Sequence, residues 1–234
     1  MKIISIIPAR GGSKCIPRKN IYRIFGKPLI GYTIEHAFAS DRIERVIVST
    51  DDEEIGVVAR VFGAEVPFLR PSEISGDETP DFPVFKHALN WLKDNECYKP
   101  DIIVHLRPTS PFRITKDIDK MVEVLMANPE ADSIRSVSVS KQTPYKMWNL
   151  NGKYIEPFID HNFNEQTLTA KQFLPQVLYH NGNIDVIRVS SIMKGESLTG
   201  KNILPFMMHN EICDIQIDSM FDLRMAEMAI RLES

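Results

Sequence analysis

The chain has 234 residues, and 43% of them are hydrophobic, which is enough for the core of one large domain. Its 28 Lys and Arg residues against 31 Asp and Glu residues give a formal net charge of −3, which argues against nucleic acid or an anionic membrane as a partner. The three cysteines form no CxxC pair, which disfavours a disulfide framework or structural zinc and predicts a cytoplasmic location. No apolar run has the length of a membrane span or the pattern of a signal peptide.

Short segments rich in Ile and Val are typical of strands buried on both faces of a parallel sheet. Segments with helical spacing lie between them, and Pro28 suits the start of the first, as Gly63 suits the end of the second. This alternation predicts an α/β fold with a doubly wound, mostly parallel sheet, whose ligands bind at the carboxyl ends of the strands. The predicted strands are residues 2–8, 45–50, 101–106 and 133–140, and the predicted helices are residues 28–41, 51–63 and 80–95.

The segment from about residue 141 to 176 has a different character. It offers a turn at Asn151-Gly152 between short apolar runs and then a polar connection, which predicts an inserted hairpin arm. We therefore expect a single domain over residues 1–234 that carries this arm as an insertion. After the arm, residues 174–190 are predicted to form two strand segments, residues 213–218 a further strand and residues 219–232 a final helix.

The loop after the first predicted strand is cationic. It reads PARGGSKCIPRKN from Pro8 to Asn20 and contains a glycine pair but no acid. Glycine amides can converge on an anion while flanking Arg and Lys residues neutralise it, so the loop suits a nucleotide phosphate chain. It matches neither GxxxxGK[ST] nor GxGxxG, which weakens both an ATPase and an NAD-linked interpretation. The alternative is a plain turn with solvated cations.

The same stretch resembles the signature of the acylneuraminate (CMP-sialic acid synthetase type) cytidylyltransferases. Further stretches follow in the family's order over essentially the whole chain: GKPLIGYTIEHA, VIVSTDDEEI, FLRPSEIS, LRPTSPFR, TPYKMW, LPQV with HNG, and IQID with DL. The resemblance implies a Rossmann-like nucleotidyltransferase fold and a Mg²⁺-dependent reaction of CTP with a nonulosonic sugar acid that releases pyrophosphate. It also implies a homodimer in which the arm at residues 141–176 reaches toward the partner's site.

The resemblance assigns roles residue by residue. The residues expected to be catalytic are Arg10, Lys19 and Asp218. Those expected to bind the nucleotide are Ala9, Arg10, Gly11, Gly12, Ser13, Lys14, Lys19, Asn20 and Arg70. Those expected to bind the acceptor are Arg107, Lys146, Lys171, Gln172, Gln176, Tyr179 and Asn181. The expected metal ligands are Asp218 and Asp214.

Several positions depart from the family pattern. Gln216 replaces the first acid of the family's D-x-D pair, and Asp214 would lie on the same strand face as Asp218 and substitute in part. Asp218-Ser219 could instead cap the last helix. Arg107 stands where many sialate-using members have Gln, and Tyr179-His180 stands where they place an arginine for the sugar carboxylate. The identity of the acceptor therefore stays open.

Two alternatives follow from these departures. The chain could be a nucleotidyltransferase that uses another triphosphate, such as GTP, or a sugar phosphate, which is already ionised and would favour the extra arginine at Arg107. It could also be a non-catalytic subunit that binds a nucleotide or a sugar and whose metal site is lost at Gln216.

Overall fold

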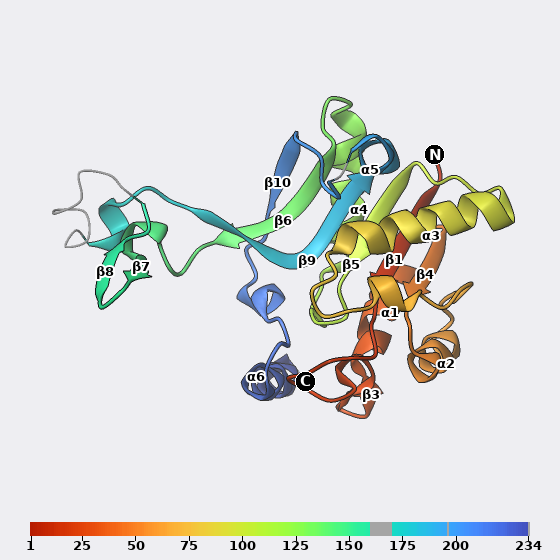
Figure 1. Cartoon of the computed structure of the whole chain (residues 1–234), viewed down its shortest axis with the longest axis horizontal. Helices are drawn as coiled ribbons and strands as arrows, with labels where there is room; N and C mark the ends of the chain where they lie inside the picture. Colours follow the sequence, from red (N-terminus) through yellow and green to blue (C-terminus); the bar gives the residue numbers. More distant parts are fainter. Residues whose placement is uncertain (160–169, 196, 234) are drawn as a thin grey trace.

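The computed structural model describes residues 1–159, 170–195 and 197–233 of the chain. Its centre is a six-stranded sheet with the order β10-β6-β9-β5-β1-β4 (Figure 1). All of its strands run in one direction except β9, which pairs antiparallel with both neighbours. The predicted mostly parallel α/β fold is therefore confirmed. The strands are β1 (Ile3–Pro8), β4 (Arg45–Ser49), β5 (Ile102–Leu106), β6 (Ser133–Val139), β9 (Leu178–Arg188) and β10 (Ile203–Met207).

Helices cover both faces of this sheet. In β1, Ile3 and Ile7 belong to one core cluster while Ile4 and Ile6 belong to another, so successive side chains enter opposite layers. This burial on both faces explains the continuous apolar runs that identified the strands. The first layer contains α1 (Leu29–Phe38), α2 (Glu53–Val61) and α4 (Thr115–Ala127), and the second contains α3 (Asp81–Glu96) and α5 (Val189–Lys194).

Local signals set the ends of the predicted helices. Pro28 immediately precedes α1, and the Asp52 carboxylate accepts a 3.0 Å hydrogen bond from the backbone N–H of Ile55 at the start of α2. Gly63 follows α2 with a φ of +90°, a conformation that glycine tolerates at a helix end. The sequence prediction omitted α4, although its buried residues Ile118, Met121, Val122 and Leu125 have helical spacing.

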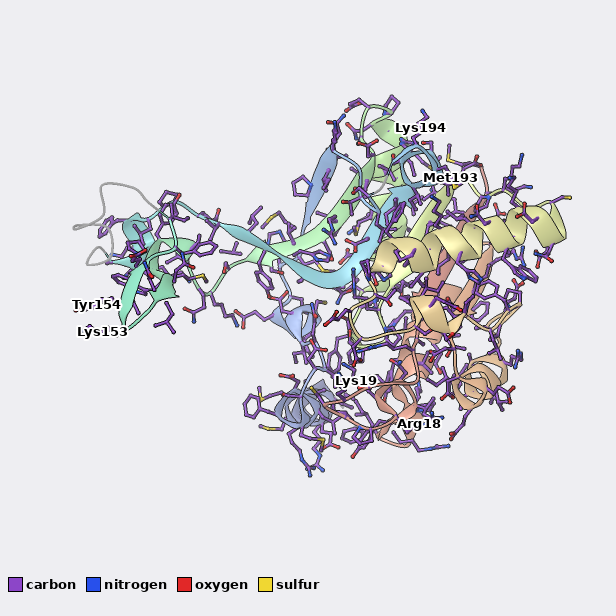
Figure 2. All side chains as sticks on the ribbon, viewed as in Figure 1. Arg18, Lys19, Lys153, Tyr154, Met193 and Lys194 are labelled. Atoms are coloured by element: carbon purple, nitrogen blue, oxygen red, sulfur yellow. The ribbon has the colours of Figure 1, made fainter. Side chains whose placement is uncertain are left out.

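The segment between β6 and β9 projects away from the sheet (Figure 1). It contains a short 3₁₀ turn, η3 (Pro144–Lys146), then β7 (Trp148–Asn151) and β8 (Tyr154–Pro157), which pair around Gly152 with a φ of +61°. Lys153 and Tyr154 lie at the far end of this projection (Figure 2). Part of the predicted arm, residues 160–169, lies outside the described residues.

The chain returns to the sheet in one strand. Residues 174–190 were predicted to form two segments, but β9 is continuous over Leu178–Arg188. Its pairing with β6 changes register between Arg135, opposite Asp185, and Val137, opposite His180. The irregular residues in between include Gly182, whose φ of +67° bends the strand. The sequence prediction also omitted α5 and the edge strand β10.

The strand predicted over residues 213–218 is wrong. Residues Glu211–Asp214 form a 3₁₀ turn, η5, and no strand follows before α6 (Met220–Glu233). Helix α6 packs against the cationic loop through a third core cluster that joins Ile16 and Leu29 to Ile217 and Leu223. This packing brings the C-terminal segment to the first loop. No helix in the described ranges is long and apolar enough to cross a membrane.

Candidate active site

A pocket of about 240 Å³ opens at the carboxyl ends of β1 and β5, where a doubly wound sheet is expected to bind its ligand. Its walls come from the cationic loop, from the segment between α2 and α3, and from the residues that follow β5. Among the residues predicted from the sequence, it is lined by Arg10, Ser13, Lys19, Asn20, Arg70 and Arg107.

An acid that the sequence prediction missed lies among the loop cations. The Asp77 carboxylate forms ion pairs with both Arg10 and Lys14 and lines the same pocket. The hydrogen bonds from Lys14 and then Arg10 lower the pKa of Asp77 below its ordinary value. Two cations therefore converge on one anionic group at the position where a phosphate was expected.

Arg18 has a structural role in the loop. It adopts a left-handed φ of 57°, and its guanidinium pairs with Asp52 and Glu54 of the α2 start. The hydrogen bond to Asp52 raises the pKa of Arg18 above its ordinary value. This contact ties the loop to α2 and removes Arg18 from the cations that remain for a ligand.

The first glycine of the pair is required by packing. A Cβ on Gly11 would lie 2.7 Å from the Asp52 carboxylate, and the Gly11 N–H donates a 3.0 Å hydrogen bond to Asp51. A Cβ on Gly12 would have no neighbour within 4 Å. The amide of Gly11 is thus engaged by the protein, whereas Gly12 lies in open space.

Two predicted nucleotide contacts are buried and hydrogen bonded. Arg70 is 6% exposed, and its Nε donates a 3.2 Å hydrogen bond to the Ser49 hydroxyl; burial lowers the pKa of its guanidinium. The Asn20 amide donates a 2.8 Å hydrogen bond to the carbonyl of Arg10, which fixes the loop backbone. The N–H of Ala9 bonds to the Ser49 carbonyl at 2.9 Å and continues the sheet.

Lys19 and Asp218 meet from opposite ends of the sequence. The Lys19 ammonium lies 2.9 Å from the Asp218 carboxylate, next to the start of α6 (Figure 2). The Lys19 side chain is only 15% exposed, whereas that of Asp218 is 66% exposed. Of the proposed cap at Asp218-Ser219, Ser219 is the residue that caps α6: its Oγ accepts from the Asp222 N–H at 3.2 Å, and the Asp222 carboxylate accepts from the Ser219 N–H at 2.7 Å. The Asp218 carboxylate is therefore not the helix cap.

Asp214 does not share a face with Asp218 as the sequence predicted. Because the strand predicted over residues 213–218 does not form, the Asp214 carboxylate accepts hydrogen bonds from Ser138 and Asn181 at 2.5 and 3.1 Å. The Gln216 amide donates to the Asn181 carbonyl. Within residues 1–159, 170–195 and 197–233, no three His, Cys, Asp or Glu side chains form a group that could hold a metal. A metal at Asp218 would depend on ligands from the substrate.

The predicted acceptor residues divide between two places in one protomer. Arg107 lies in the first pocket, whereas Lys171, Gln172 and Gln176 line a cavity of about 420 Å³ at the root of the arm. The Lys171 ammonium donates to the carbonyls of Ser140 and Lys141 at 3.1 and 2.5 Å. Lys146 lies in η3 on the arm itself.

Asn181 and Tyr179 lie between these two places. The Asn181 side chain is fully buried and bonds to Ser136, Ser138 and Asp214, so the structure places it in the core and not in a pocket. Burial, followed by the hydrogen bond to Asp214, raises the pKa of Tyr179 to about 12, so its hydroxyl keeps its proton at neutral pH.

The structure also adds a buried charge cluster. The Asp185 carboxylate of β9 is 0% exposed and accepts from Arg107 at 3.0 Å, from Arg135 at 2.9 Å and from His180 at 3.0 Å. Arg107 also contacts Asp81 at 3.3 Å. A signal was present in the sequence, because a lone charged residue inside an apolar strand needs a charged partner. The residues next to Asp185 in the sequence do not show which side chain that partner is.

Comparison with known proteins identifies the family. A family model described as Cytidylyltransferase matches residues 4–183. The chain is 33% identical over 226 residues to an N-acylneuraminate cytidylyltransferase from Escherichia coli, in a match covering 96% of this chain and 51% of that relative. It is 31% identical over 238 residues to a pseudaminic acid cytidylyltransferase from Campylobacter jejuni, covering 99% of this chain and 97% of that relative. The chain thus spans about half the length of the first relative and nearly all of the second.

A solved structure agrees with the fold. A CMP:2-keto-3-deoxy-manno-octonic acid synthetase in complex with CTP superposes with a TM-score of 0.73 over 100% of both chains, at 18% sequence identity. The family model covers most of the chain, and the motifs in the sequence point to the same group of enzymes. The chain is therefore a nucleotidyltransferase that belongs to the cytidylyltransferase family.

Proposed function

We propose that the chain forms a CMP-sugar from CTP and a nonulosonic (sialic-like) sugar acid, with release of pyrophosphate. The observation that carries this proposal is that Arg10 and Lys19 line one pocket together with Asp77, whose carboxylate pairs with both Arg10 and Lys14. The names of the two relatives support CTP as the nucleotide and a nonulosonic acid as the acceptor class.

In the proposed reaction, a hydroxyl oxygen of the sugar forms a bond to the α-phosphorus while the bond from that phosphorus to the pyrophosphate oxygen breaks. The hydroxyl proton passes to solvent. Arg10 and Lys14 hold the terminal phosphates in place of Asp77, and Lys19 neutralises the charge that develops on the leaving pyrophosphate. Such a site acts mainly by positioning the reactants and by stabilising charge.

Mg²⁺ fits this arrangement through Asp218. The Asp218 carboxylate is exposed beside Lys19, and Mg²⁺ is commonly held by one or two carboxylates together with substrate phosphates and water. When bound, the ion would neutralise phosphate charge. Asp218 would hold it, and Lys19 beside that carboxylate would stay close to the phosphate chain.

The test is a screen of CTP, GTP, ATP and UTP against nonulosonic acids and sugar 1-phosphates with pyrophosphate detection. We expect pyrophosphate release from CTP with a nonulosonic acid. Lys19→Met should lower kcat by about 10²-fold to 10³-fold, the usual cost of removing a group that stabilises transition-state charge. Lys116→Met, at an exposed position on α4, is the matched control and should leave kcat unchanged.

Two outcomes of this screen would favour the alternatives. Turnover only with another triphosphate or only with a sugar phosphate would contradict the proposal, and Arg107 in the pocket is the observation that favours the sugar phosphate. CTP binding without pyrophosphate release at saturating Mg²⁺ would indicate a non-catalytic subunit. In that case Gln216→Asp is the variant expected to restore activity.

We also propose that the protein is a cytoplasmic homodimer whose arm, residues 141–176, makes the contact. The division of the acceptor residues supports this, because Lys146, Lys171 and Gln172 lie on or beside the arm and away from the pocket that contains Arg107. In a dimer, the arm of one protomer would complete the site of the other.

A further inference from the structure

The buried cluster around Asp185 continues the wall of the first pocket. Arg107 lines that pocket, and its Nη1 lies 3.0 Å from Asp185 Oδ2. The Nη2 of Arg135 lies 3.4 Å from the same oxygen, and its Nε lies 2.9 Å from Oδ1. Two guanidinium groups are thus held side by side by one carboxylate, and one of them already faces the pocket.

This carboxylate cannot take up a further ligand. Asp185 is 0% exposed, and its two oxygens receive hydrogen bonds from Arg107, Arg135 and His180. Burial would raise the pKa of Asp185, but the hydrogen bond from His180, the charge of Arg107 and the hydrogen bond from Arg135 outweigh that effect and hold the pKa well below the ordinary value. Asp185 is therefore a permanent anion whose role is to orient the groups around it.

Two carboxylates, Asp185 and Asp81, balance the charges of Arg107 and Arg135, but they leave donors of Arg135 unused. Arg107 has a second acidic neighbour in Asp81 at 3.3 Å. For Arg135, the described part of the chain shows no acidic partner other than Asp185 and no hydrogen bond from Nη1. The Arg135 side chain is 26% exposed, so these N–H donors are accessible from solvent. Arg135 is joined through Asp185 to Arg107, which lines the first pocket. A guanidinium with unpaired donors matches the geometry of a carboxylate, which it can bind through two parallel hydrogen bonds.

We propose that Arg135, oriented by Asp185 beside Arg107, binds the carboxylate of the sugar-acid acceptor. This assignment rests on the proposed function. Arg135 is then a specificity-determining residue that separates a sugar acid from a neutral sugar, and Asp185 is a positioning residue that fixes the two guanidinium groups. The assignment also accounts for a buried acid in the middle of an apolar sheet, where an unpaired charge would be costly.

The test compares a sugar acid with a neutral analogue. The probes are the nonulosonic acid with the highest turnover in the screen and its C1 carboxamide, each titrated at saturating CTP. In Arg135→Gln, we expect the acceptor KM for the acid to rise about tenfold or more, as for the loss of a bidentate guanidinium–carboxylate contact. The KM for the carboxamide and the KM for CTP should stay within about twofold of the parent values. Arg135→Lys keeps the charge but loses the two parallel donors of the guanidinium, so its KM for the acid should lie between the values of the parent and of Arg135→Gln.

A matched control separates binding from folding. Arg188 lies on β9, the strand next to β6, which carries Arg135; it is partly buried and donates to the carbonyls of Ala131 and Asn128 at 2.9 and 3.2 Å. Arg188→Gln should lower the melting temperature without changing the ratio of the KM values for acid and carboxamide. An unchanged ratio in a folded Arg135→Gln enzyme that still turns over CTP overturns this assignment and leaves the proposed function intact. Absence of turnover with every sugar acid overturns both.

Discussion

Asp77 places a carboxylate between Arg10 and Lys14, two cations that the sequence analysis predicts to bind phosphate. It lies 67 residues from Arg10 in the sequence, in the segment that follows the 3₁₀ turn η2 (Ser72–Ile74). A triphosphate in this pocket would carry more negative charge than one carboxylate and would compete for the same two cations. We therefore expect a nucleotide bound here to displace Asp77.

The consequence can be measured at this residue. Asp77→Asn should tighten CTP binding by about threefold, since exposed ion pairs are individually weak. Titration calorimetry at low and high salt checks this, and the difference between variant and parent should shrink as salt rises. Asp94→Asn, at an exposed acid that pairs with Lys93 at 3.7 Å on α3, is the control. Weaker CTP binding by Asp77→Asn would instead mean that Asp77 takes part in the occupied site.

At the scale of elements, the hairpin of β7 and β8 has one apolar face. Leu150 pairs directly with Ile155, and Trp148 pairs with Pro157 two positions along, so these side chains lie on the same side of the two strands. Leu150 is 78% exposed and Ile155 is 58% exposed. A two-stranded hairpin is marginal by itself in water, and contiguous exposed apolar side chains are typical of an interface. This face is therefore the part of the arm that we expect to contact the partner protomer.

Leu150→Lys should shift the equilibrium from dimer toward monomer by about tenfold or more, because it places a charge in the centre of the proposed contact. Sedimentation equilibrium provides the measurement. Val61→Lys on α2, where the parent side chain is 79% exposed, is the matched control and should leave the oligomeric state unchanged. A Leu150→Lys protein that remains a dimer would rule out this face as the contact.

At the scale of the whole molecule, the centre of the sheet contains charges and imidazoles that depend on pH. Burial, followed by the charge of Arg107, lowers the pKa of His105 to about 3, and burial lowers that of His36 to about 4. Below pH 6.5 the unfolded chain binds protons at these histidines that the folded chain does not, so stability falls as pH falls. The pKa of Asp185 is lowered in the same direction in the folded chain, so its stabilisation is complete above the unfolded carboxyl pKa of about 4 and is lost as pH falls further.

Between pH 6 and pH 4, the free energy of unfolding should therefore fall by about 1.4 kcal/mol per pH unit for each such histidine. His105→Leu should remove about one histidine's share of this slope, because neither ring nitrogen of His105 has a hydrogen-bond partner in the described part of the protein. Urea unfolding at several pH values gives the slope. His209→Leu, at an exposed histidine, should keep the parent slope. An unaltered slope in His105→Leu would show that this histidine titrates normally in the folded chain.

The sequence by itself determined the features that depend on neighbours along the chain. Continuous apolar runs indicated the central strands, Pro28 and Gly63 marked helix ends, and glycine and cation content identified the loop that lines the pocket. Helix α4, which the sequence prediction omitted, could also have been predicted, because its buried residues follow the helical period. Each of these signals arises from backbone geometry or periodicity within one element.

Only the tertiary structure decided which charges meet. Lys19 and Asp218 are 199 residues apart, and Arg107 and Asp185 are 78 residues apart, so no local pattern links either pair. The antiparallel direction of β9 likewise depends on packing, and so does the absence of the strand predicted before α6. Because that strand does not form, the Asp214 carboxylate contacts Ser138 and does not lie beside Asp218. Long-range ion pairs form only after the sheet has brought distant segments together. The sequence could therefore identify the cationic loop, but not that Asp77 pairs with its cations or that Asp185 joins Arg107 to Arg135.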